Sequence, residues 1–375
     1  MNITLSLSVR ALVNVEALNM AESVGNYTRH RKAPVVFATN GCYTIVYVPV
    51  ISGEALAHGY QQLLVQIAKS RELPVTSMDE QGYFLKFSSI DILDNWYPEL
   101  QKFAGSRKVS EWANNASLED LEKAFLKVSV VADVGGFLLA GKLLKRTSPI
   151  RFSYMVPALD AVGTGGVTLI PQLHVRYAPP ELVQRQEQRE KQGQQQEQEQ
   201  KQEGQRRGQQ AMFYVESSSA LYTFTAELLA SDIARLFYAK QQDPQLTQEK
   251  MKRVEAAVDA LIAMVDGFLF GAKRSRYMPL WEIKSIVVSV SKGPLEFVVS
   301  PGISKNYIKE TYDRAVALVK AIPEQTVNIY AYVSESLEEP SVKAEVKNVT
   351  YSKVQGHTEA LVEAKKKIMD MLPTL

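Results

Sequence analysis

Residues 2–16 read NITLSLSVRALVNVE, and this stretch decides the fold class. Apolar residues occupy every odd position from Ile3 to Val15, and polar residues occupy all but one of the positions between them. Successive side chains of a strand point to opposite faces, so this period of two predicts a long β-strand with one buried face. The other face carries Arg10 and Asn14 and is expected to stay polar.

Outward from this strand, the sequence predicts helices and strands in an irregular order. A helix is expected after Ser52, a good N-cap residue, because apolar side chains follow at helical spacing. Further helices are predicted over 117–128, 247–266, 304–320 and 357–372, and strands over 42–50, 150–157, 167–177, 212–225, 283–291, 295–300 and 326–333. This irregular mixture favours an α+β fold over a doubly wound parallel sheet.

The chain has 375 residues, of which 46% are hydrophobic and 22% are charged, as in an ordinary globular protein with a sizeable core. We expect a single domain over 1–375 with insertions. Residues 184–210 contain only Gln, Glu, Lys, Arg and Gly. With no apolar group to bury, this tract is expected to be a disordered surface loop inside the domain, since strands are predicted on both sides of it.

Composition excludes several classes of site. A single cysteine, Cys42, cannot form an internal disulfide or a multi-cysteine zinc site, and the four histidines are scattered, so no metal and no cofactor is expected. The N-terminus has no signal-peptide pattern, and no stretch approaches the roughly 20 apolar residues of a membrane helix. We therefore expect a soluble, cytoplasmic protein without a membrane partner.

No catalytic motif withstands inspection. Residues 136–143 have the spacing of a Walker A loop, but Leu143 stands where a hydroxyl should hold magnesium. The sequence has no GxSxG motif, and Cys42 lies in a predicted strand, where burial is expected. His58 could serve as an acid or base, donate to a phosphate, or make a structural hydrogen bond.

Two basic clusters carry the strongest functional signal, because the net charge is only +2 and positive charge is therefore concentrated in patches. Residues 142–151 and 273–276 combine lysines and arginines with nearby glycines and with Tyr154 and Tyr277. Glycines allow close approach of a backbone, arginine and lysine bind phosphate, and tyrosines can stack on bases. The aromatic signature of RNA-recognition motifs is absent, so these clusters favour sequence-tolerant binding along a single RNA strand.

Several separated motifs resemble those of one family. Residues 14–27, 50–58, 153–157 and 273–279 are similar, in order, to segments of the backbone (DevR-type RAMP) subunit of the archaeal type I-A CRISPR Cascade complex. The resemblance covers nearly the whole chain except the glutamine-rich tract.

This resemblance implies a modified RRM-like (ferredoxin-like) palm with inserted helical and β-rich lobes that form fingers and a thumb. It also implies a non-catalytic subunit that stacks head-to-tail along CRISPR RNA and presents guide bases to target DNA. The other expected partners are the second RAMP subunit that caps the backbone, the small and large subunits, and a helicase-nuclease.

The resemblance assigns RNA contacts to four regions: the first strand's polar face, a loop over 29–32, the start of the helix after Ser52, and the two basic clusters. The expected RNA-binding residues are Arg10, Asn14, Arg29, His30, Arg31, Lys32, Ser52, Gly53, His58, Lys142, Lys145, Arg146, Arg151, Tyr154, Lys273, Arg274 and Arg276. Residues 142–151 are expected in the thumb-like insertion.

Two alternatives remain open. The first is an RNA-cleaving RAMP enzyme that uses His58 or a loop acid such as Asp133. The second is a regulator that binds duplex DNA, although no helix-turn-helix pattern supports it.

Overall fold

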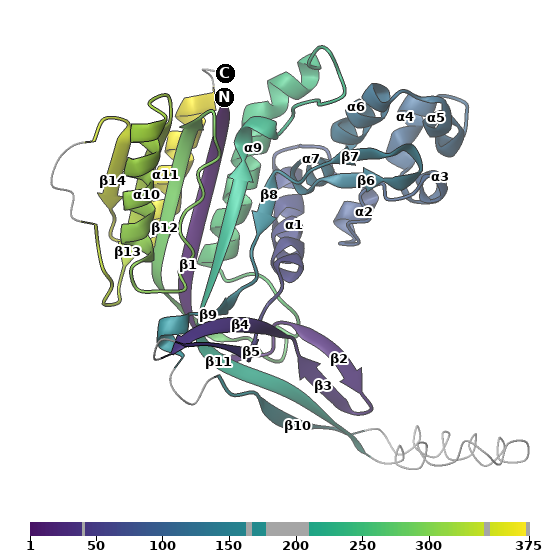
Figure 1. Ribbon diagram of the computed structural model, residues 1–375. Helices are drawn as coiled ribbons and strands as arrows, with labels where there is room; N and C mark the ends of the chain where they lie inside the picture. Colours follow the sequence, from purple (N-terminus) through teal and green to yellow (C-terminus); the bar gives the residue numbers. More distant parts are fainter. Residues whose placement is uncertain (40–41, 163–166, 178–209, 341–345, 373–375) are drawn as a thin grey trace, which may run out of the picture.

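The computed structural model describes residues 1–39, 42–162, 167–177, 210–340 and 346–372 (Figure 1). A large mixed sheet has the strand order β14-β13-β12-β1-β11-β3-β2, and β8, β9 and β10 also pair with β11. Helices lie on this sheet and in a separate lobe beside it (Figure 1). The α+β class expected from the sequence is confirmed.

The predicted first strand is the centre of the sheet. β1 pairs antiparallel with β11 on one side and with β12 on the other. The strands of this region are β1 (Asn2–Glu16), β8 (Ile150–Phe152), β9 (Val156–Pro157), β11 (Gln210–Leu229), β12 (Leu280–Gly293), β13 (Thr326–Val333) and β14 (Val349–Lys353). β14 runs parallel to β13, whereas the other pairs in this region are antiparallel.

The odd-numbered face of β1 is buried under three helices, as the alternation predicts. α1 (Gly53–Ser70), α9 (Pro244–Asp266) and α11 (His357–Met371) contribute buried apolar side chains to the same core cluster as Ile3 and Leu5. α10 (Tyr307–Ala321) belongs to a second core cluster with β12 and β13.

The even-numbered face of β1 is polar, as expected, but another segment of the chain covers it, so it is not an open surface. Ser6 and Ser8 are fully buried under residues 294–304, whose backbone crosses this face. The N–H of Val299 donates to Ser6 Oγ at 3.3 Å, and that of Gly302 donates to Ser8 Oγ at 2.9 Å. Residues 295–300 do not form the predicted strand, because backbone donors of this segment bind side chains: Leu295 donates to Gln325, Val299 to Ser6 and Ser300 to Thr311.

Residues 77–146 form a lobe that we call the helical lobe. Its helices are α2 (Ser77–Glu80), η1 (Ile90–Ile92), α3 (Leu93–Trp96), η2 (Pro98–Leu100), α4 (Gln101–Ala104), α5 (Val109–Asn115), α6 (Leu118–Val128), α7 (Val130–Gly135) and η3 (Ala140–Lys142). A short ribbon of β6 (Phe137–Leu139) and β7 (Leu144–Arg146) ends it. The rings of Phe87 and Phe125 stack 4.0 Å apart at its core. The sequence predicted only α6 here, because the other helices are a few turns long or less.

A second projection, the arm, continues the sheet away from the helices (Figure 1). It contains β2 (Met20–Val24), β3 (Tyr27–His30), β10 (Ile170–Tyr177) and the first part of β11. β4 (Lys32–Thr39) and β5 (Cys42–Pro49) form a separate two-stranded ribbon beside it. Tyr177 pairs with Gln210, and the tract predicted to be disordered lies, apart from Gln210, outside the described residues.

The longer predicted elements are confirmed with small shifts of their ends. The helix expected over 357–372 spans His357–Met371, and the strand expected over 326–333 spans Thr326–Val333. Cys42 begins β5 as expected, but its side chain is exposed. The short helices η4 (Leu159–Ala161) and η5 (Ala230–Asp232) were not predicted. Across the described ranges, no helix has the length and apolarity to cross a bilayer.

Candidate nucleic-acid interface

The connection between β1 and β2 holds three distant segments together by accepting hydrogen bonds from their backbone N–H groups. The carbonyl of Leu18 accepts from the N–H of Ala272 at 2.6 Å, and the carbonyl of Asn19 accepts from the N–H of Arg31 at 2.8 Å. The side-chain oxygen of Asn19 accepts from the N–H of Ser52 at 2.9 Å. The sequence predicted RNA contacts beside each of these segments, and the structure brings them to one place.

We call the surface formed there the junction surface, defined by Arg31, Ser52, Gly53, Tyr154, Lys273 and Arg274. The Nε atoms of Arg31 and Arg274 are buried and have no hydrogen-bond partner among the described residues. Buried donors normally have a partner, so Arg31 and Arg274 each carry one N–H group that the described part of the chain leaves unsatisfied. Phosphate oxygens suit the guanidinium geometry well.

The start of α1 contributes to the junction surface. Ser52 caps this helix by accepting from the N–H of Ala55 at 3.2 Å, so its hydroxyl already has a role in the fold. The first turn of a helix leaves other N–H groups without an intrahelical acceptor, which favours an anion nearby. Tyr154 is 47% exposed beside this helix start, because its neighbour Met155 pairs with Ile51.

The glycines near these residues serve packing within the chain. A Cβ on Gly53 would lie 2.5 Å from the carbonyl oxygen of Phe152, and one on Gly271 would lie 2.8 Å from the Leu18 side chain. Close approach is therefore needed at both positions, as the sequence indicated, but the groups approached belong to the protein itself.

The basic segment 273–276 reaches from the junction surface to the arm. The guanidinium of Arg276 lies over the ring of Phe213, 5.7 Å from the ring centre. The ring of His174 stacks on the same Phe213 ring, with 5.2 Å between the two ring centres. The ring nitrogen Nε2 of His174 is hydrogen-bonded to the hydroxyl of Tyr277, whose pKa is raised by burial. Sequence reasoning missed Asn19, His174 and Phe213, since each gains significance only through partners distant in the chain.

The expected loop over 29–32 is mostly strand. Arg29 and His30 end β3, Lys32 begins β4, and only Arg31 lies between them. Arg29 is exposed and pairs with Glu22 at 3.0 Å. Arg29, His30 and Lys32 line a hollow of about 520 Å³ together with Glu22 and Glu216, so its charges are nearly balanced.

The side chain of His30 is buried, so His30 is not one of the exposed basic residues. Its Nε2 lies 2.9 Å from Glu16 Oε2, and both side chains are fully buried. Tyr222 donates to the other oxygen of Glu16 at 2.7 Å, and the N–H of His30 donates to Glu216 at 2.8 Å. Burial lowers the pKa of His30, but the hydrogen bond and the charge of Glu16 outweigh it, so the pKa is raised on balance.

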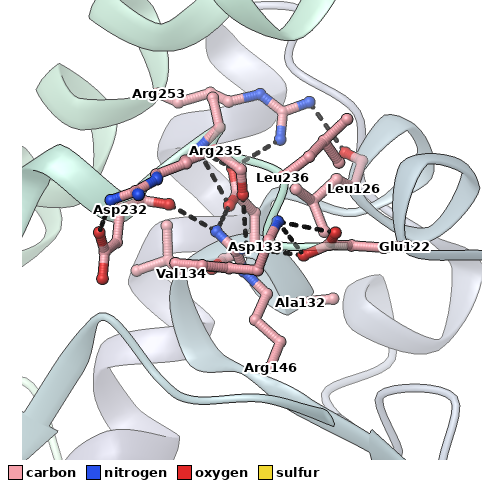
Figure 2. Close-up of polar contacts among 12 residues, drawn as sticks. Glu122, Leu126, Ala132, Asp133, Val134, Arg146, Asp232, Arg235, Leu236 and Arg253 are labelled. Atoms are coloured by element: carbon pink, nitrogen blue, oxygen red, sulfur yellow. Dashed lines mark hydrogen bonds and ion pairs between the residues drawn. The ribbon is translucent and has the colours of Figure 1, made fainter. Parts of the chain in front are cut away.

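Arg146 is also buried, and it is therefore no surface contact. Figure 2 shows its polar contacts. Arg146 pairs with Asp133, whose second oxygen lies 2.9 Å from Nη1 of the fully buried Arg253. The N–H of Ala234 donates to both oxygens of Asp133 at 3.1 and 3.0 Å. Asp133 therefore joins the helical lobe to α9 and lacks the exposure that a catalytic loop acid needs.

Arg10 does not face solvent, because residues 294–304 cover its side of β1. Its guanidinium is 1% exposed and pairs at 2.9 Å with Asp160 and at 2.9 Å with Glu335. It also donates to the carbonyl of Gly302 at 3.0 Å. Burial opposes its charge, but the two carboxylates raise its pKa on balance. Arg10 is thus a structural clamp between two loops.

Four further residues that were expected to contact RNA do not belong to the junction surface. Asn14 is half-buried near the end of β1, opposite Leu280. Lys142 donates to the carbonyl of Asn114 at 3.0 Å, and Lys145 is exposed on the helical lobe. Arg151 pairs with Glu227 at 3.1 Å and with Glu296 at 2.8 Å.

His58 is exposed on α1. Its ring meets that of Phe84 edge-on, with 5.2 Å between the two ring centres. In the part of the chain that the structure describes, no group of three or more His, Cys, Asp or Glu side chains could hold a metal ion.

The chain is similar to known proteins over most of its length. A family model described as "CRISPR-associated negative auto-regulator DevR/Csa2" matches residues 7–312. CRISPR-associated protein Cas7/Csa2 1 of Saccharolobus solfataricus is 38% identical over 309 residues, which cover 82% of this chain and 85% of that protein. The CRISPR-associated aCascade subunit Cas7/Csa2 2 of the same organism is 39% identical over 340 residues, which cover 89% and 93%.

These matches define the class as that of CRISPR-associated proteins. The chain belongs to the DevR/Csa2 family, so the family resemblance found in the sequence is confirmed. A chain of a solved "CRISPR RNA-guided surveillance complex, pre-nicking" aligns with a TM-score of 0.47 at 11% identity, over 97% of this chain and 100% of that one. The family assignment does not depend on this last likeness.

Proposed function

We propose that this protein binds CRISPR RNA without cleaving it and assembles head-to-tail along the guide as the backbone of a Cascade complex. The junction surface holds the RNA phosphates, and the bases remain free to pair with target DNA. The backbone-capping RAMP subunit, the small and large subunits and the helicase-nuclease are the proposed partners in the cytoplasm. Curated relatives named as Cas7/Csa2 proteins, one of them an aCascade subunit, support this assignment.

The observation that carries the proposal is a pair of arginines at one surface, each with an Nε–H group that has no partner among the described residues. Arg31 and Arg274 come from segments more than 240 positions apart in the sequence, yet both are held at the Leu18–Asn19 connection. Lys273 and the start of α1 add positive charge and a positive dipole end beside them. Contacts of this kind bind a phosphate backbone whatever its sequence.

We further propose that the core is a modified ferredoxin-like palm. The order β12-β1-β11, with β8 and β9 on the outer side of β11, supports this, and so do α1 and α9 on one face. The helical lobe is then an insertion after α1, and the β-rich arm combines a segment between β1 and α1 with a second segment after β9. The expected thumb-like segment 142–151 leads out of the helical lobe back to the sheet.

The cleaving alternatives have less support from the geometry. Asp133 has both oxygens bound by buried donors, so it cannot bind a metal and RNA without dismantling the link between lobe and α9. His58 has an aromatic edge contact, and no described ion pair links it to an acid. No feature of the described residues specifically supports the alternative that the protein is a regulator that binds duplex DNA.

The proposal is tested on purified protein mixed with CRISPR RNA, with and without magnesium. Size exclusion with light scattering is combined with a denaturing gel on the same sample. We expect intact RNA carrying a number of protein copies that grows with RNA length. Shortened RNA would overturn the non-catalytic assignment, and a single copy on long RNA would overturn the assembly.

A further inference from the structure

A buried ion pair is bonded to the framework of the junction surface. The side chains of Glu16 and His30 have no exposed area, and Glu16 Oε2 lies 2.9 Å from His30 Nε2. The same carboxylate oxygen accepts from the N–H of Leu18 at 2.9 Å, within the connection whose carbonyls hold Arg31 and Ala272 in place. The pair therefore supports the junction surface from inside the protein.

The regular pattern of β1 is broken where Glu16 is buried. From Val13 to Glu16, β1 advances three residues while β11 advances two, from Ala220 to Ser218, so β1 carries one extra residue here. Val15 has a φ of 53°, which β-branched residues rarely adopt, and it is 54% exposed where the alternation predicts burial. Backbone strain that exposes an apolar side chain beside a buried charged one is typical of a functional position.

Both ring nitrogens of His30 face oxygen acceptors. Nε2 lies against the carboxylate of Glu16, and Nδ1 lies 2.9 Å from the carbonyl oxygen of Arg31. A neutral imidazole has one N–H group, so it donates to only one of these oxygens and turns a nitrogen lone pair toward the other. The imidazolium donates to both. The geometry around the ring therefore favours its protonated form.

The charged groups near the ring also favour its protonated form on balance. Burial lowers the pKa of His30. The hydrogen bond and charge of Glu16, aided by the Arg31 carbonyl and the charge of Glu216, outweigh burial, so that the pKa is raised. Glu216 accepts from the N–H of His30 at 2.8 Å and from the hydroxyl of Tyr27 at 3.1 Å. The other ionisable groups nearby are Tyr222, which donates to Glu16, and Glu22, Arg29 and Lys32 around the adjoining hollow.

A change in the protonation of His30 acts on the carbonyl of Arg31. Hydrogen bonds to a charged group are the stronger ones, and an unpaired buried carboxylate is costly, so a ring with one proton keeps it on Nε2, toward Glu16. Nδ1 then turns a lone pair toward the Arg31 carbonyl, and repulsion replaces that hydrogen bond. The described residues otherwise hold the backbone of Arg31 through the carbonyl of Asn19 at 2.8 Å and the N–H of Val50 at 3.0 Å, neither of which titrates.

We propose that the imidazolium of His30, held between Glu16 and the carbonyl of Arg31, positions the Arg31 guanidinium for an RNA phosphate, and that loss of its proton weakens RNA binding. This inference rests on the proposed RNA binding at the junction surface and adds to it a pair of positioning residues that do not touch RNA. RNA affinity is then highest below the folded pKa of His30, which is raised above its ordinary value of about 6.5, and declines as pH rises through that folded pKa.

RNA binding and protonation of His30 must then favour each other. If the protonated form binds RNA more tightly by a given factor, RNA raises the pKa of His30 by the decimal logarithm of that factor. Loss of one charge-assisted hydrogen bond corresponds to about tenfold in affinity, and hence to about one pH unit. A histidine that only stabilises the fold would titrate at the same pH with and without RNA.

Two measurements on the full chain test this coupling between about pH 6 and pH 9. Fluorescence anisotropy gives the affinity for a labelled oligouridine long enough for one copy of the protein. NMR of protein labelled with ¹⁵N-histidine follows the ring nitrogens, and single His→Gln variants assign the four histidines. In wild type, affinity should fall about tenfold across this range, and the oligouridine should move the His30 midpoint upward by about one pH unit.

Four variants identify the residues responsible, with circular dichroism at each pH as the check on folding. His30→Gln should lower the affinity at pH 6 and remove its pH dependence. Glu16→Gln keeps an oxygen for the N–H of Leu18 but removes the charge, so the midpoint of the binding profile should move to lower pH. Arg31→Ala should also lose the pH dependence, because His30 acts through Arg31. His357→Gln, on α11, is the matched histidine control and should keep the wild-type profile.

The outcomes separate this inference from the proposed function. If wild-type protein binds the oligouridine equally well across the pH range, or if RNA leaves the His30 midpoint in place, the inference is wrong and the proposed function stands. A pH dependence that persists in His30→Gln would assign it to another group, such as the exposed His58, and would also overturn the inference. If wild-type protein binds RNA at no pH, the proposed function fails and the inference with it. Should His30→Gln unfold, the titrations of wild type and Glu16→Gln still decide.

Discussion

The side-chain oxygen of Asn19 accepts a hydrogen bond from the backbone N–H of Ser52 at 2.9 Å, so the end of β1 fixes the start of α1. Asn19 also holds Arg31 through its carbonyl. Asn19 carries no charge, yet it sets where the charged groups of the junction surface lie. Position and charge can therefore be tested separately.

Arg274→Ala should weaken binding of unrelated single-stranded RNAs equally and flatten the log–log salt slope by roughly 0.7, because one phosphate contact is lost. Asn19→Ala should weaken binding as well but leave the slope unchanged, since no cation is removed. Fluorescence anisotropy over a range of salt concentrations measures both. Lys320→Ala, at an exposed lysine on α10, is the control. A sequence-selective loss in Arg274→Ala would contradict the phosphate role.

Asp133→Ala should destabilise the protein by about 3–5 kcal/mol, because Arg146 and Arg253 would stay buried without their shared carboxylate. Urea unfolding measures the loss. Asp313→Ala removes an exposed pair with Lys309 and should cost about 0.3–0.5 kcal/mol. Similar costs for the two variants would mean that the buried network does not hold the lobe to α9.

The His30–Glu16 pair should make stability depend on pH. The pKa of His30 is raised in the folded protein, so its protonated form stabilises the fold. This stabilisation is fully present below the unfolded pKa of about 6.5 and is lost as pH rises through the higher folded pKa. Urea midpoints between pH 5 and 9 should show the decline in wild type and a flatter profile in His30→Gln. An unchanged profile in the variant would assign the dependence to other groups.

Gly59→Ala should destabilise the protein, although alanine favours a helix interior over glycine by about 1 kcal/mol. A Cβ at position 59 would lie 2.6 Å from Cβ of Phe270, so α1 would be pushed away from the segment that leads into the junction surface. The thermal midpoint gives the sign. Gly356→Ala, where a new Cβ meets nothing within 4 Å, is the control. A raised midpoint in Gly59→Ala would show that this contact relaxes easily.

Replacing residues 178–209 with Asn-Gly should leave folding and RNA binding intact. Tyr177 and Gln210 are paired neighbours on β10 and β11, and a two-residue Asn-Gly turn can join such a pair. Circular dichroism and the RNA titration measure the outcome. Loss of either property would make the tract part of the working structure.

The sequence predicted the central strand and the long helices well, because their periodicity is local information. It did not predict that residues 294–304 cover the even face of β1. The covering segment lies nearly 300 positions away in the chain, and the pattern of β1 itself contains no information about it. The same limit explains why basic residues were overcounted as surface contacts. The partners that bury Arg10 are 150 and 325 positions distant.

The candidate site was predicted in parts but not as a whole. Arg31, Ser52 and the 273–276 segment were each identified from charge or capping, yet their meeting point depends on Leu18 and Asn19, which have no conspicuous chemistry. His30 and Arg146 look like exposed cations in the sequence because the acids that neutralise them, Glu16 and Asp133, are not adjacent to them. Long-range pairing of charges cannot be inferred from spacing alone.

β11 belongs to the arm and to the central sheet without a break. Its 20 residues pair with β10 in the first part and with β1 in the second, over a length of roughly 65 Å. The arm therefore continues into the middle of the molecule along one backbone, and the pairing of this strand with β1 is irregular between Ala220 and Ser218. A displacement of the arm would therefore reach β1 through its pairing with β11, and β1 leads directly into the Leu18–Asn19 connection.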